Sequence, residues 1–242
     1  MLKRTIDIGL SVLGLVSLSP LMLFACLAIF LQDFRSPFYI APKEKKNEKT
    51  FKMIKLRSMI VHADKTGVDS TGANDRRITA LGKLIRKFKL DELPQLWNVF
   101  KSEMSLVGPR PNVKRETDLY TSEEKKILEI RPGITDLASI VFADLGDILN
   151  NSQNPNLDYN QLIRPVKSRL GIFYRQHHNL AMDVKLIYLT LLNSVSRVKA
   201  LQGIQNILKK YKSAPELIEW AGRQKPLVPL APPGSDQIVA RR

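Results

Sequence analysis

Two adjacent carboxylates, Asp91 and Glu92, follow a basic stretch in the segment RKFKLDELPQLWN (residues 86–98). One explanation is structural, because Asp, Glu and Pro all favour the start of a helix and acids there suit the helix dipole. The other is chemical. Side chains one residue apart on a helix diverge by about 100°, so the pair cannot face each other across a sugar ring as glycosidase carboxylates do. It fits a division of labour between a nucleophile and a cation ligand, and this segment alone leaves both explanations open.

The cation that such a pair would bind is a hard one. The chain has three histidines and a single cysteine, and no spacing among them resembles a pair of zinc ligands. Two carboxylates with little imidazole or thiol nearby suit Mg²⁺, with Mn²⁺ as the alternative. Asp91 and Glu92 are therefore candidates both for catalysis and for binding the metal.

The net charge indicates a polyanionic partner. The chain carries a formal charge of +15 and has a pI near 9.9, which suits nucleic acid, an anionic membrane surface or a phosphorylated substrate. The sequence has no glycine-rich phosphate loop, so basic side chains would have to hold any bound phosphate. The candidates for this role are Lys55, Arg57, Arg86, Arg110 and Arg131.

Two of these arginines lie in stiff segments. Arg110 is enclosed in GPRP (residues 108–111), and Arg131 begins RPGIT (residues 131–135). A rigid turn alone would explain either motif. The functional alternative is a preorganised guanidinium that binds phosphate or a base edge.

An uncharged apolar run covers residues 8–31, which exceeds the roughly 20 residues that a membrane-crossing helix needs. It is too long for the core of a cleaved signal peptide. Ser19 and Pro20 lie at its middle, where proline should kink the helix and Ser19 could satisfy freed backbone groups. Basic residues flank the run on both sides, and the positive-inside rule then favours a re-entrant hairpin over a kinked single span. Cys26, inside the run, is expected to be an inert thiol.

The remaining elements are short. Two strands are expected at residues 36–41 and 49–56, joined by a charged, solvated loop. Helical spacing of apolar residues predicts helices at 79–88, from Asp91 onward, at 159–174 and at 180–198. The inner face of the second helix is predicted to consist of Leu93, Leu96, Trp97 and Phe100.

The predicted fold class is α+β and helix-rich. Residues 1–35 form the re-entrant membrane helix. Residues 36–200 form the main folded domain, and its helix at 180–198 is a core or interfacial helix, because its uncharged part is too short to cross a membrane. Residues 201–242 form a C-terminal extension, partly disordered, whose PLVPLAPPGSD stretch is proline-rich.

The segment LDELPQLWNVFKSEMSLVGPRP (residues 90–111) resembles the central signature of the bacterial sugar transferase family, the monotopic polyprenyl-phosphate glycosyl-1-phosphate transferases. The resemblance covers most of residues 1–200. It includes Lys3, Arg4 and Asp7, the break at Ser19 and Pro20, and five further motifs: KLRSM (55–59), RRIT (76–79), GKLIR (82–86), RPGIT (131–135) and NLAMDVKLIYLTLLNSV (179–195).

This resemblance implies that residues 36–200 are a small catalytic domain on a membrane surface, ending in interfacial helices. It also implies transfer of a sugar-1-phosphate from a nucleoside diphosphate sugar, usually a UDP-sugar, to undecaprenyl phosphate with release of UMP. Asp91 matches the nucleophile, Glu92 its partner, and Mg²⁺ the cofactor. Nucleophilic attack by a carboxylate would give an acyl-phosphate intermediate. The product would initiate glycan assembly (exopolysaccharide, capsule, O-antigen or glycoprotein). The expected location is the bacterial inner membrane, with a cytoplasmic catalytic domain against anionic lipids of the inner leaflet.

Three segments depart from the family pattern. IAPKEKKNEK (residues 40–49) replaces a Gln-x-Arg-x-Gly stretch, KSEM (101–104) replaces Lys-Gly-Asp-Met, and Asp136 follows RPGIT where a glycine is common. The sequence does not reveal the sugar, the pathway, or whether a homodimer forms. Two rival interpretations are a catalytically idle membrane scaffold and a nucleic-acid-binding protein, but the latter has no reading motif in this sequence and nucleic acid is not an expected partner.

Overall fold

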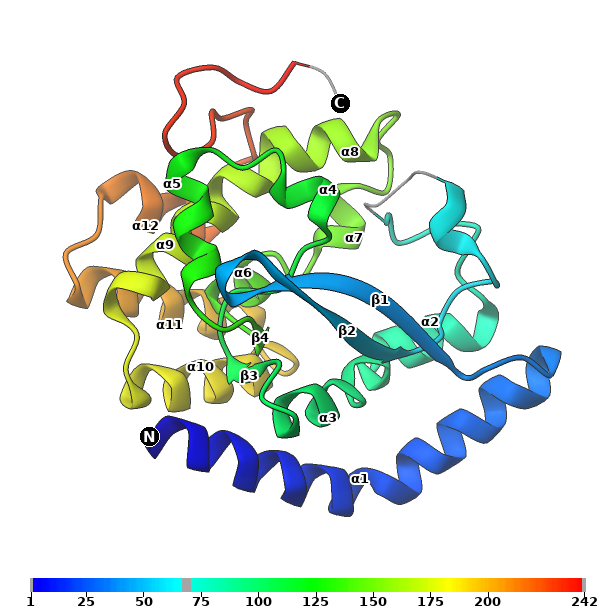
Figure 1. The fold of residues 1–242 in the computed structure, drawn as a ribbon. Helices are drawn as coiled ribbons and strands as arrows, with labels where there is room; N and C mark the ends of the chain where they lie inside the picture. The colour runs from blue at the N-terminus through cyan, green and yellow to red at the C-terminus, as the bar shows by residue number, and fades with distance from the viewer. Residues whose placement is uncertain (1, 67–70, 241–242) are drawn as a thin grey trace.

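The structure, a computed structural model, describes residues 2–66 and 71–240 and is helix-rich with two small sheets (Figure 1), as predicted. The strands are β1 Phe38–Lys45, β2 Lys49–Leu56, β3 Ser105–Val107 and β4 Gly133–Thr135. The longer helices are α1 Leu2–Asp33, α2 Ala80–Lys87, α9 Arg164–His177, α10 Leu180–Asn193, α11 Arg197–Lys210 and α12 Pro215–Gly222. The shorter ones are α3 Gln95–Phe100, α4 Lys114–Thr117, α5 Ser122–Lys125, α6 Leu137–Val141, α7 Leu145–Ile148 and α8 Pro155–Asp158.

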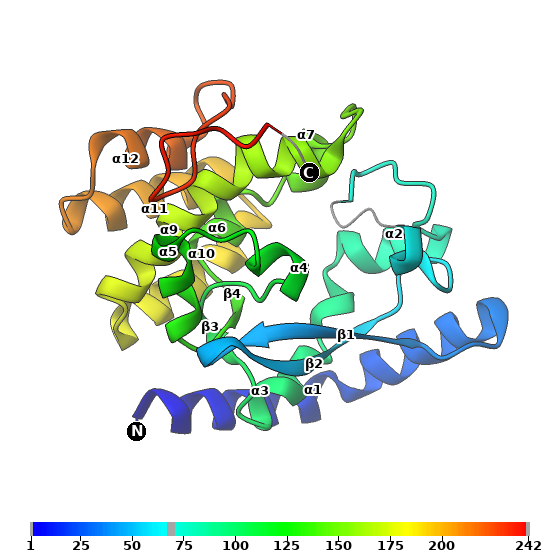
Figure 2. The ribbon, with the colours of Figure 1, turned by 45° about the horizontal axis from the view of Figure 1, so that its top comes forward.

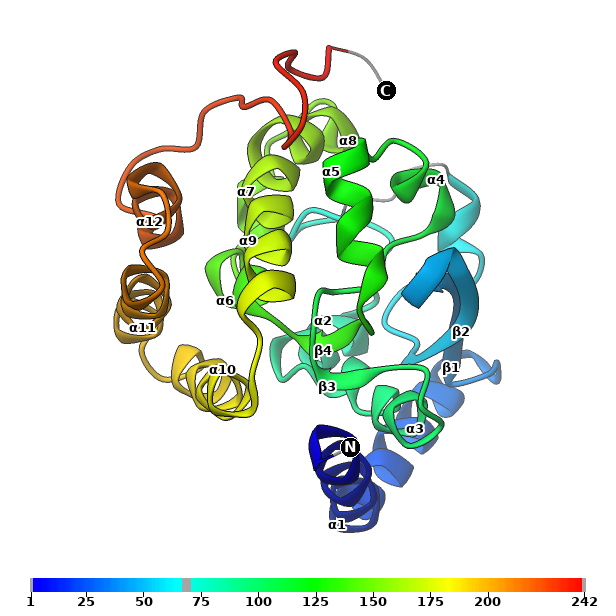
Figure 3. The same cartoon turned by 60° about the vertical axis from the view of Figure 1, so that its left-hand side comes forward.

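The main hydrophobic core lies among α6 and α9 to α12. Leu137, Val166, Leu186 and Ile204 are each at most 1% exposed within it, and Figure 3 shows α10, α11 and α12 in a row beside α9. Pro165 occupies the first turn of α9, where its missing N–H costs nothing. A π-helical turn, Tyr159–Ile163, directly precedes α9, so the helical segment predicted at 159–174 changes its winding just before this proline.

The C-terminal region contributes to the same core. Helix α11 crosses the boundary expected at residue 200, and its Ile204 and Leu208 are fully buried. Beyond α12 the chain has no helix or strand up to residue 240. It nevertheless contacts the body, because the Leu230 amide donates to the Gln161 carbonyl (3.0 Å) and Arg169 donates to the Ala231 carbonyl (3.1 Å).

Strands β1 and β2 form an antiparallel hairpin whose register runs from Phe38 opposite Leu56 to Lys45 opposite Lys49. β1 is longer than predicted, so the expectation of a solvated loop starting at residue 43 is wrong. Paired residues of an antiparallel hairpin share a face, and that face alternates along each strand. Lys43 therefore lies on the same face as Lys55, and this face packs inward through the buried Met53.

Helix α1 is continuous and contains Pro20, although Figures 1 and 2 show it bending near its middle. Pro20 has no N–H to offer the Val16 carbonyl, and the Ser19 hydroxyl donates to that carbonyl at 2.8 Å. The prediction that Ser19 satisfies a freed backbone group is confirmed. The predicted kink is confirmed as a bend near Pro20, and the helix continues through it.

Both ends of α1 are fastened to the catalytic domain. Near its start, Lys3 pairs with Asp183 of α10 at 2.5 Å, and buried Asp7 accepts a bond from Ser105 at 2.7 Å. At its end, Asp33 accepts two bonds from Arg57, at 2.6 and 2.7 Å. Since both ends contact one domain, both belong on that domain's side of any membrane that α1 enters.

The predicted inner face of α3 points partly outward. In α3 the buried residues are Gln95, Asn98 and Val99, whereas Trp97 and Phe100 are 45% and 40% exposed. Asn98 is inside because it binds the β2 backbone, accepting from Ile54 N (3.0 Å) and donating to Lys52 O (2.8 Å). The apolar stripe of α10 is exposed too, at Val184, Tyr188, Leu191 and the following Val195. These helices lie at the end of the molecule that carries α1 (Figures 1 and 3).

Candidate active site

Asp91 and Glu92 lie on a 3₁₀ turn, Leu90–Glu92, between α2 and α3. Helix α3 begins only at Gln95, and no side chain caps it, so the prediction that a helix starts at Asp91 or Glu92 is wrong. Among the residues that the structure describes, none donates a hydrogen bond to the Asp91 carboxylate or forms an ion pair with it. A helix cap therefore does not explain why an acid occupies this position.

Glu92 is held firmly. Arg110 binds both of its carboxylate oxygens, with Arg110 Nη1 at 3.1 Å from Oε2 and Nη2 bound to Oε1. The Lys55 ammonium lies 3.7 Å from Oε1. A two-pronged arginine–carboxylate pair is among the stronger and more directional polar contacts in proteins.

Arg110 is positioned by the contact between two motifs that the sequence analysis identified separately. GPRP follows β3 and RPGIT contains β4. These two strands pair in parallel, and Gly108 packs against Gly133. A Cβ on Gly133 would lie 2.1 Å from the Gly108 nitrogen, so only glycine permits this approach. The Arg110 guanidinium also donates to the Ile134 carbonyl at 3.2 Å.

Asp136 supports the same arginine. Its carboxylate accepts from the Arg110 amide at 3.2 Å and caps α6 by accepting from the Ser139 amide at 2.6 Å. This departure from the family pattern therefore has a structural role in aligning Arg110.

Arg86 approaches from α2. Its Nε donates to the Ser58 hydroxyl at 2.8 Å, and α2 is capped by Thr79, which accepts from the Gly82 amide at 2.9 Å. A Cβ on Gly82 would lie 1.9 Å from the Ser58 carbonyl. Glycine is therefore needed for α2 to approach the end of the hairpin and bring Arg86 to Asp91.

Burial and the surrounding charges together shift the pKa values of the two carboxylates in opposite directions. Burial raises the pKa of Asp91, and the positive charges of Lys55, Arg86 and Arg110 only partly oppose this effect. Burial would also raise the pKa of Glu92, but Arg110 and Lys55 outweigh it and hold that pKa at about 2. Glu92 is thus ionised at neutral pH, whereas Asp91 is a more basic carboxylate surrounded by positive charge.

Lys43 is a component of this region that the sequence analysis missed. It lies on the Lys55 face of the hairpin, and burial together with the charges of Lys55, Arg110 and Lys167 lowers its pKa to about 7. Alternation along residues 41–55 could have revealed it, because Lys43 shares parity with buried Ala41. The run of charges around it instead suggested a solvated turn.

Two predicted phosphate ligands lie elsewhere. Arg57 is 9% exposed, and Asp33 together with the Ser36 carbonyl (2.8 Å) engages its guanidinium. Its observed role is to anchor the end of α1. Arg131 lies near Arg4 of α1, close enough for their charges to repel.

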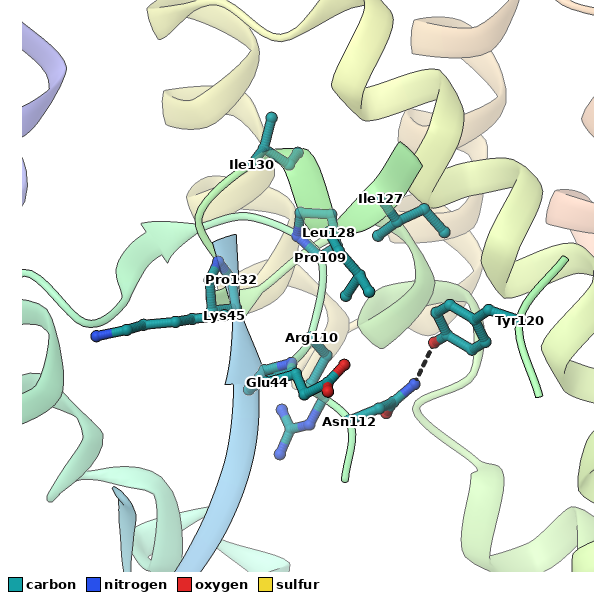
Figure 4. A pocket seen from close by; sticks show the side chains of 11 residues that line it. Glu44, Lys45, Pro109, Arg110, Asn112, Tyr120, Ile127, Leu128, Ile130 and Pro132 are labelled. Atoms are coloured by element: carbon teal, nitrogen blue, oxygen red, sulfur yellow. Dashed lines mark hydrogen bonds between the residues drawn. The ribbon is translucent and has the colours of Figure 1, made fainter. Parts of the chain in front are cut away.

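A small hollow adjoins Arg110 on the side of α5 and the following turn (Figure 4). Tyr120 and Asn112, which are hydrogen-bonded to each other, form one wall of it. Its remaining lining is Glu44, Lys45, Pro109, Arg110, Pro111, Ile127, Leu128, Ile130 and Pro132.

The donor set suits a cation that arrives with a substrate. Among the described residues, no three His, Cys, Asp or Glu side chains gather as a metal site, and Arg110 already occupies Glu92. Asp91 is the unengaged carboxylate. Mg²⁺ commonly takes one or two carboxylates and completes its shell with substrate phosphate oxygens and water, so the residues present fit that mode.

Comparison with known proteins gives a consistent result. A family model described as bacterial sugar transferase matches residues 1–197. The exopolysaccharide production protein ExoY of Sinorhizobium fredii is 37% identical over 153 residues, covering 57% of this chain and 68% of that protein. The uncharacterized sugar transferase EpsL of Bacillus subtilis is 31% identical over 204 residues, covering 84% of this chain and 90% of its own length.

Other relatives are considerably longer than this chain. The undecaprenyl-phosphate glucose phosphotransferase of Komagataeibacter xylinus is 35% identical over 199 residues, covering 78% of this chain but only 35% of that protein. The chain thus spans about a third of the length of this relative.

The pairing of Glu92 predicts a pH-dependent contribution to stability. A carboxylate whose pKa falls on folding stabilises the native state above its unfolded pKa of about 4.5, and this stabilisation disappears as the pH falls toward 2. We expect Glu92→Gln to lower the free energy of unfolding at pH 7 by about 1–3 kcal/mol. The difference from the wild type should shrink between pH 4.5 and 2, as measured by denaturant unfolding in detergent.

A matched control is Glu129→Gln, which removes an acid that is 53% exposed in its pair with Arg175. This change should be nearly neutral at every pH. An equal deficit of Glu92→Gln at pH 7 and at pH 2.5 would contradict the electrostatic explanation.

Proposed function

The chain belongs to the bacterial sugar transferase family, and from this premise we propose that it transfers a sugar-1-phosphate to undecaprenyl phosphate. The donor is a nucleoside diphosphate sugar of the UDP class, and UMP is released. Relatives named undecaprenyl-phosphate glucose and galactose phosphotransferases support the acceptor. The name of ExoY, an exopolysaccharide production protein, supports a role in exopolysaccharide production.

The observation that carries the proposal is the contrast between the two neighbouring acids. Arg110 and Lys55 neutralise Glu92, whereas Asp91 has no hydrogen-bond or ion-pair partner among the described residues although cations surround it. A partnerless carboxylate in a positive environment is accessible to attack a phosphorus atom whose oxygens those cations bind.

The reaction follows in two displacements. An Asp91 oxygen attacks the β-phosphorus of the donor, and the bond from that phosphorus to the bridging oxygen breaks with its electron pair leaving on UMP. The product is a sugar phosphate joined to Asp91 as an acyl phosphate. A phosphate oxygen of undecaprenyl phosphate then attacks the same phosphorus, and the Asp91 carboxylate is regenerated as the diphosphate-linked lipid sugar forms.

The basic side chains stabilise the charge that moves in these steps. Arg86 and Lys55 act on Asp91 and on the phosphoryl oxygens beside it, while Glu92 keeps Arg110 directed at the same place. Bound Mg²⁺ would be held by Asp91 and substrate oxygens, joined by Glu92 where Arg110 yields, and would neutralise diphosphate charge. Lys55, Arg86 and Arg110 then orient the diphosphate of the substrate and replace water around its oxygens.

The membrane-facing surface suits a lipid acceptor. Helix α1 is long and apolar enough to cross a membrane by length and composition, and its Leu13, Val16, Leu23 and Phe24 are 63–71% exposed. Because both ends of α1 are fastened to one domain, the helix enters and leaves on the domain's side. The positive-inside preference of its basic flanks supports a cytoplasmic position for that side, at the inner leaflet.

Replacing the nucleophile tests the reaction. Purified protein in detergent with Mg²⁺, undecaprenyl phosphate and a panel of UDP-sugars should release UMP with at least one donor. Asp91→Asn should reduce the rate by at least about 10³-fold, because an amide is a poor nucleophile for phosphorus. The panel also identifies the sugar.

The control is Asp118→Asn, which alters a surface acid that is 57% exposed and paired with Lys114. It should retain wild-type activity. UMP release by Asp91→Asn at the wild-type rate would refute the assignment of Asp91, and failure of every donor with the wild-type protein would refute the activity itself.

The re-entrant path of α1 predicts how its flanks react with thiol reagents. In a Cys26→Ala background, Leu2→Cys and Lys46→Cys should both be modified by a membrane-impermeant reagent from the same face, the cytoplasmic one. Right-side-out and inverted vesicles distinguish the faces. Labelling of the two positions from opposite faces would show that α1 crosses the membrane.

A further inference from the structure

Lys43 and Lys167 lie outside the group that surrounds Asp91 and have no role in the mechanism above. Lys43 is partly buried in β1, and among the described residues none hydrogen-bonds its ammonium group or forms an ion pair with it. Of the charges that act on it most strongly, those of Lys55, Arg110 and Lys167 are positive and only that of Glu116 is negative. Positive charge therefore predominates around Lys43, with the buried Glu116 as the one negative charge among these influences.

Neutral groups orient Lys167. Its ammonium donates to the Tyr159 hydroxyl at 2.9 Å and to Asn112 Oδ1 at 3.4 Å. No described acid lies within ion-pair distance of it. A lysine held by a phenol and an amide beside another lysine is costly unless an anion completes the site.

The hairpin and Asn112 place this pair relative to the acids. Lys55, which lies 3.7 Å from Glu92, is opposite Tyr39 near the open end of the hairpin, and Lys43 lies on the same face farther along β1, toward the turn. Next to Lys43, the Glu44 amide donates to the Asn112 carbonyl at 3.0 Å, and Lys167 donates to the side chain of the same asparagine. Lys43 and Lys167 therefore both lie beside Asn112, farther along the hairpin than Lys55.

The pair also lies on the side away from the membrane helix. The hairpin that carries Lys43 is between α1 and the start of α9, and Figures 1 and 2 show α1 and α9 on opposite sides of it. A lipid phosphate enters from the α1 side. A water-soluble donor nucleotide can approach from the other side.

We propose that Lys43 and Lys167, with Asn112, form a second anion subsite that binds the phosphate of the departing nucleotide. This inference rests on the proposed function. In-line displacement places the leaving oxygen opposite the attacking one, and Lys43 lies farther along the hairpin than Lys55, the lysine next to Glu92. The leaving phosphate gains negative charge as the bond breaks, and the two lysines stabilise it there.

The test compares Lys43→Met and Lys167→Met in full-length, detergent-purified protein, with UMP as the probe. By isothermal titration we expect UMP binding to weaken about tenfold in Lys43→Met and about threefold to tenfold in Lys167→Met, as expected for loss of one charge–phosphate contact. Lys43→Arg should restore binding. Uridine, which has no phosphate, should bind the variants and the wild type equally.

Lys52→Met is the matched control, since it removes an exposed lysine from the other face of the same hairpin. It should bind UMP like the wild type. The KM for undecaprenyl phosphate should be unchanged in all variants, and a single-turnover assay with donor alone should show slower UMP release in Lys43→Met and Lys167→Met.

Three results would overturn the subsite: unchanged UMP affinity in Lys43→Met, an equal loss of uridine affinity, or a rise in the KM for the lipid with UMP affinity intact. The last result would assign the lysines to the acceptor phosphate. These outcomes are separate from failure of the proposed function, in which the wild-type protein itself neither binds UMP nor releases it from any donor.

Discussion

The pairing of Arg110 with Glu92 is the interaction on which the site depends. Arg110 pairs with Glu92, one of two adjacent carboxylates, and the other, Asp91, has no hydrogen-bond or ion-pair partner among the described residues. Without the Arg110–Glu92 pair, both acids would compete for the same cations, and neither would be singled out as the nucleophile. The bidentate geometry also orients the guanidinium, whose placement requires the close contact of Gly108 with Gly133. A backbone contact between two distant motifs thus determines which acid is free to react.

The same domain couples this site to a membrane. At the start of α1, Lys3 binds α10 and Asp7 binds β3, the strand that leads to Arg110. At its end, Asp33 binds Arg57, which directly follows the strand that carries Lys55. A displacement of α1 would therefore also move the segments that carry Arg110 and Lys55, the two side chains that pair with Glu92. Exposed apolar residues of α3 and α10 extend the surface that faces lipid, so a lipid-linked phosphate would arrive close to the nucleophile.

Sequence reasoning predicted the helix-rich class, the hairpin, the bent apolar helix and its Ser19 contact. It predicted the helical periodicity of α3 and α10 and allowed α10 to be interfacial, but it assigned the apolar stripe of α3 to the interior, because periodicity does not distinguish a protein core from lipid. The pairing of Glu92 with Arg110, the anchoring role of Arg57 and the inward position of Lys43 were not predictable. Each depends on contacts between segments far apart in the chain. In the case of Lys43, the many charged residues around it also resemble a solvated loop.

The central claim is that Asp91 becomes covalently linked to the transferred sugar phosphate. Its most direct test is the intact mass of the protein after incubation with Mg²⁺ and its UDP-sugar donor in the absence of lipid acceptor. The account predicts an added mass of one sugar phosphate, located on the peptide containing Asp91, lost on adding undecaprenyl phosphate and absent from Asp91→Asn. A wild-type protein that forms no such adduct, and releases UMP only when the acceptor is present, would contradict it by showing direct transfer.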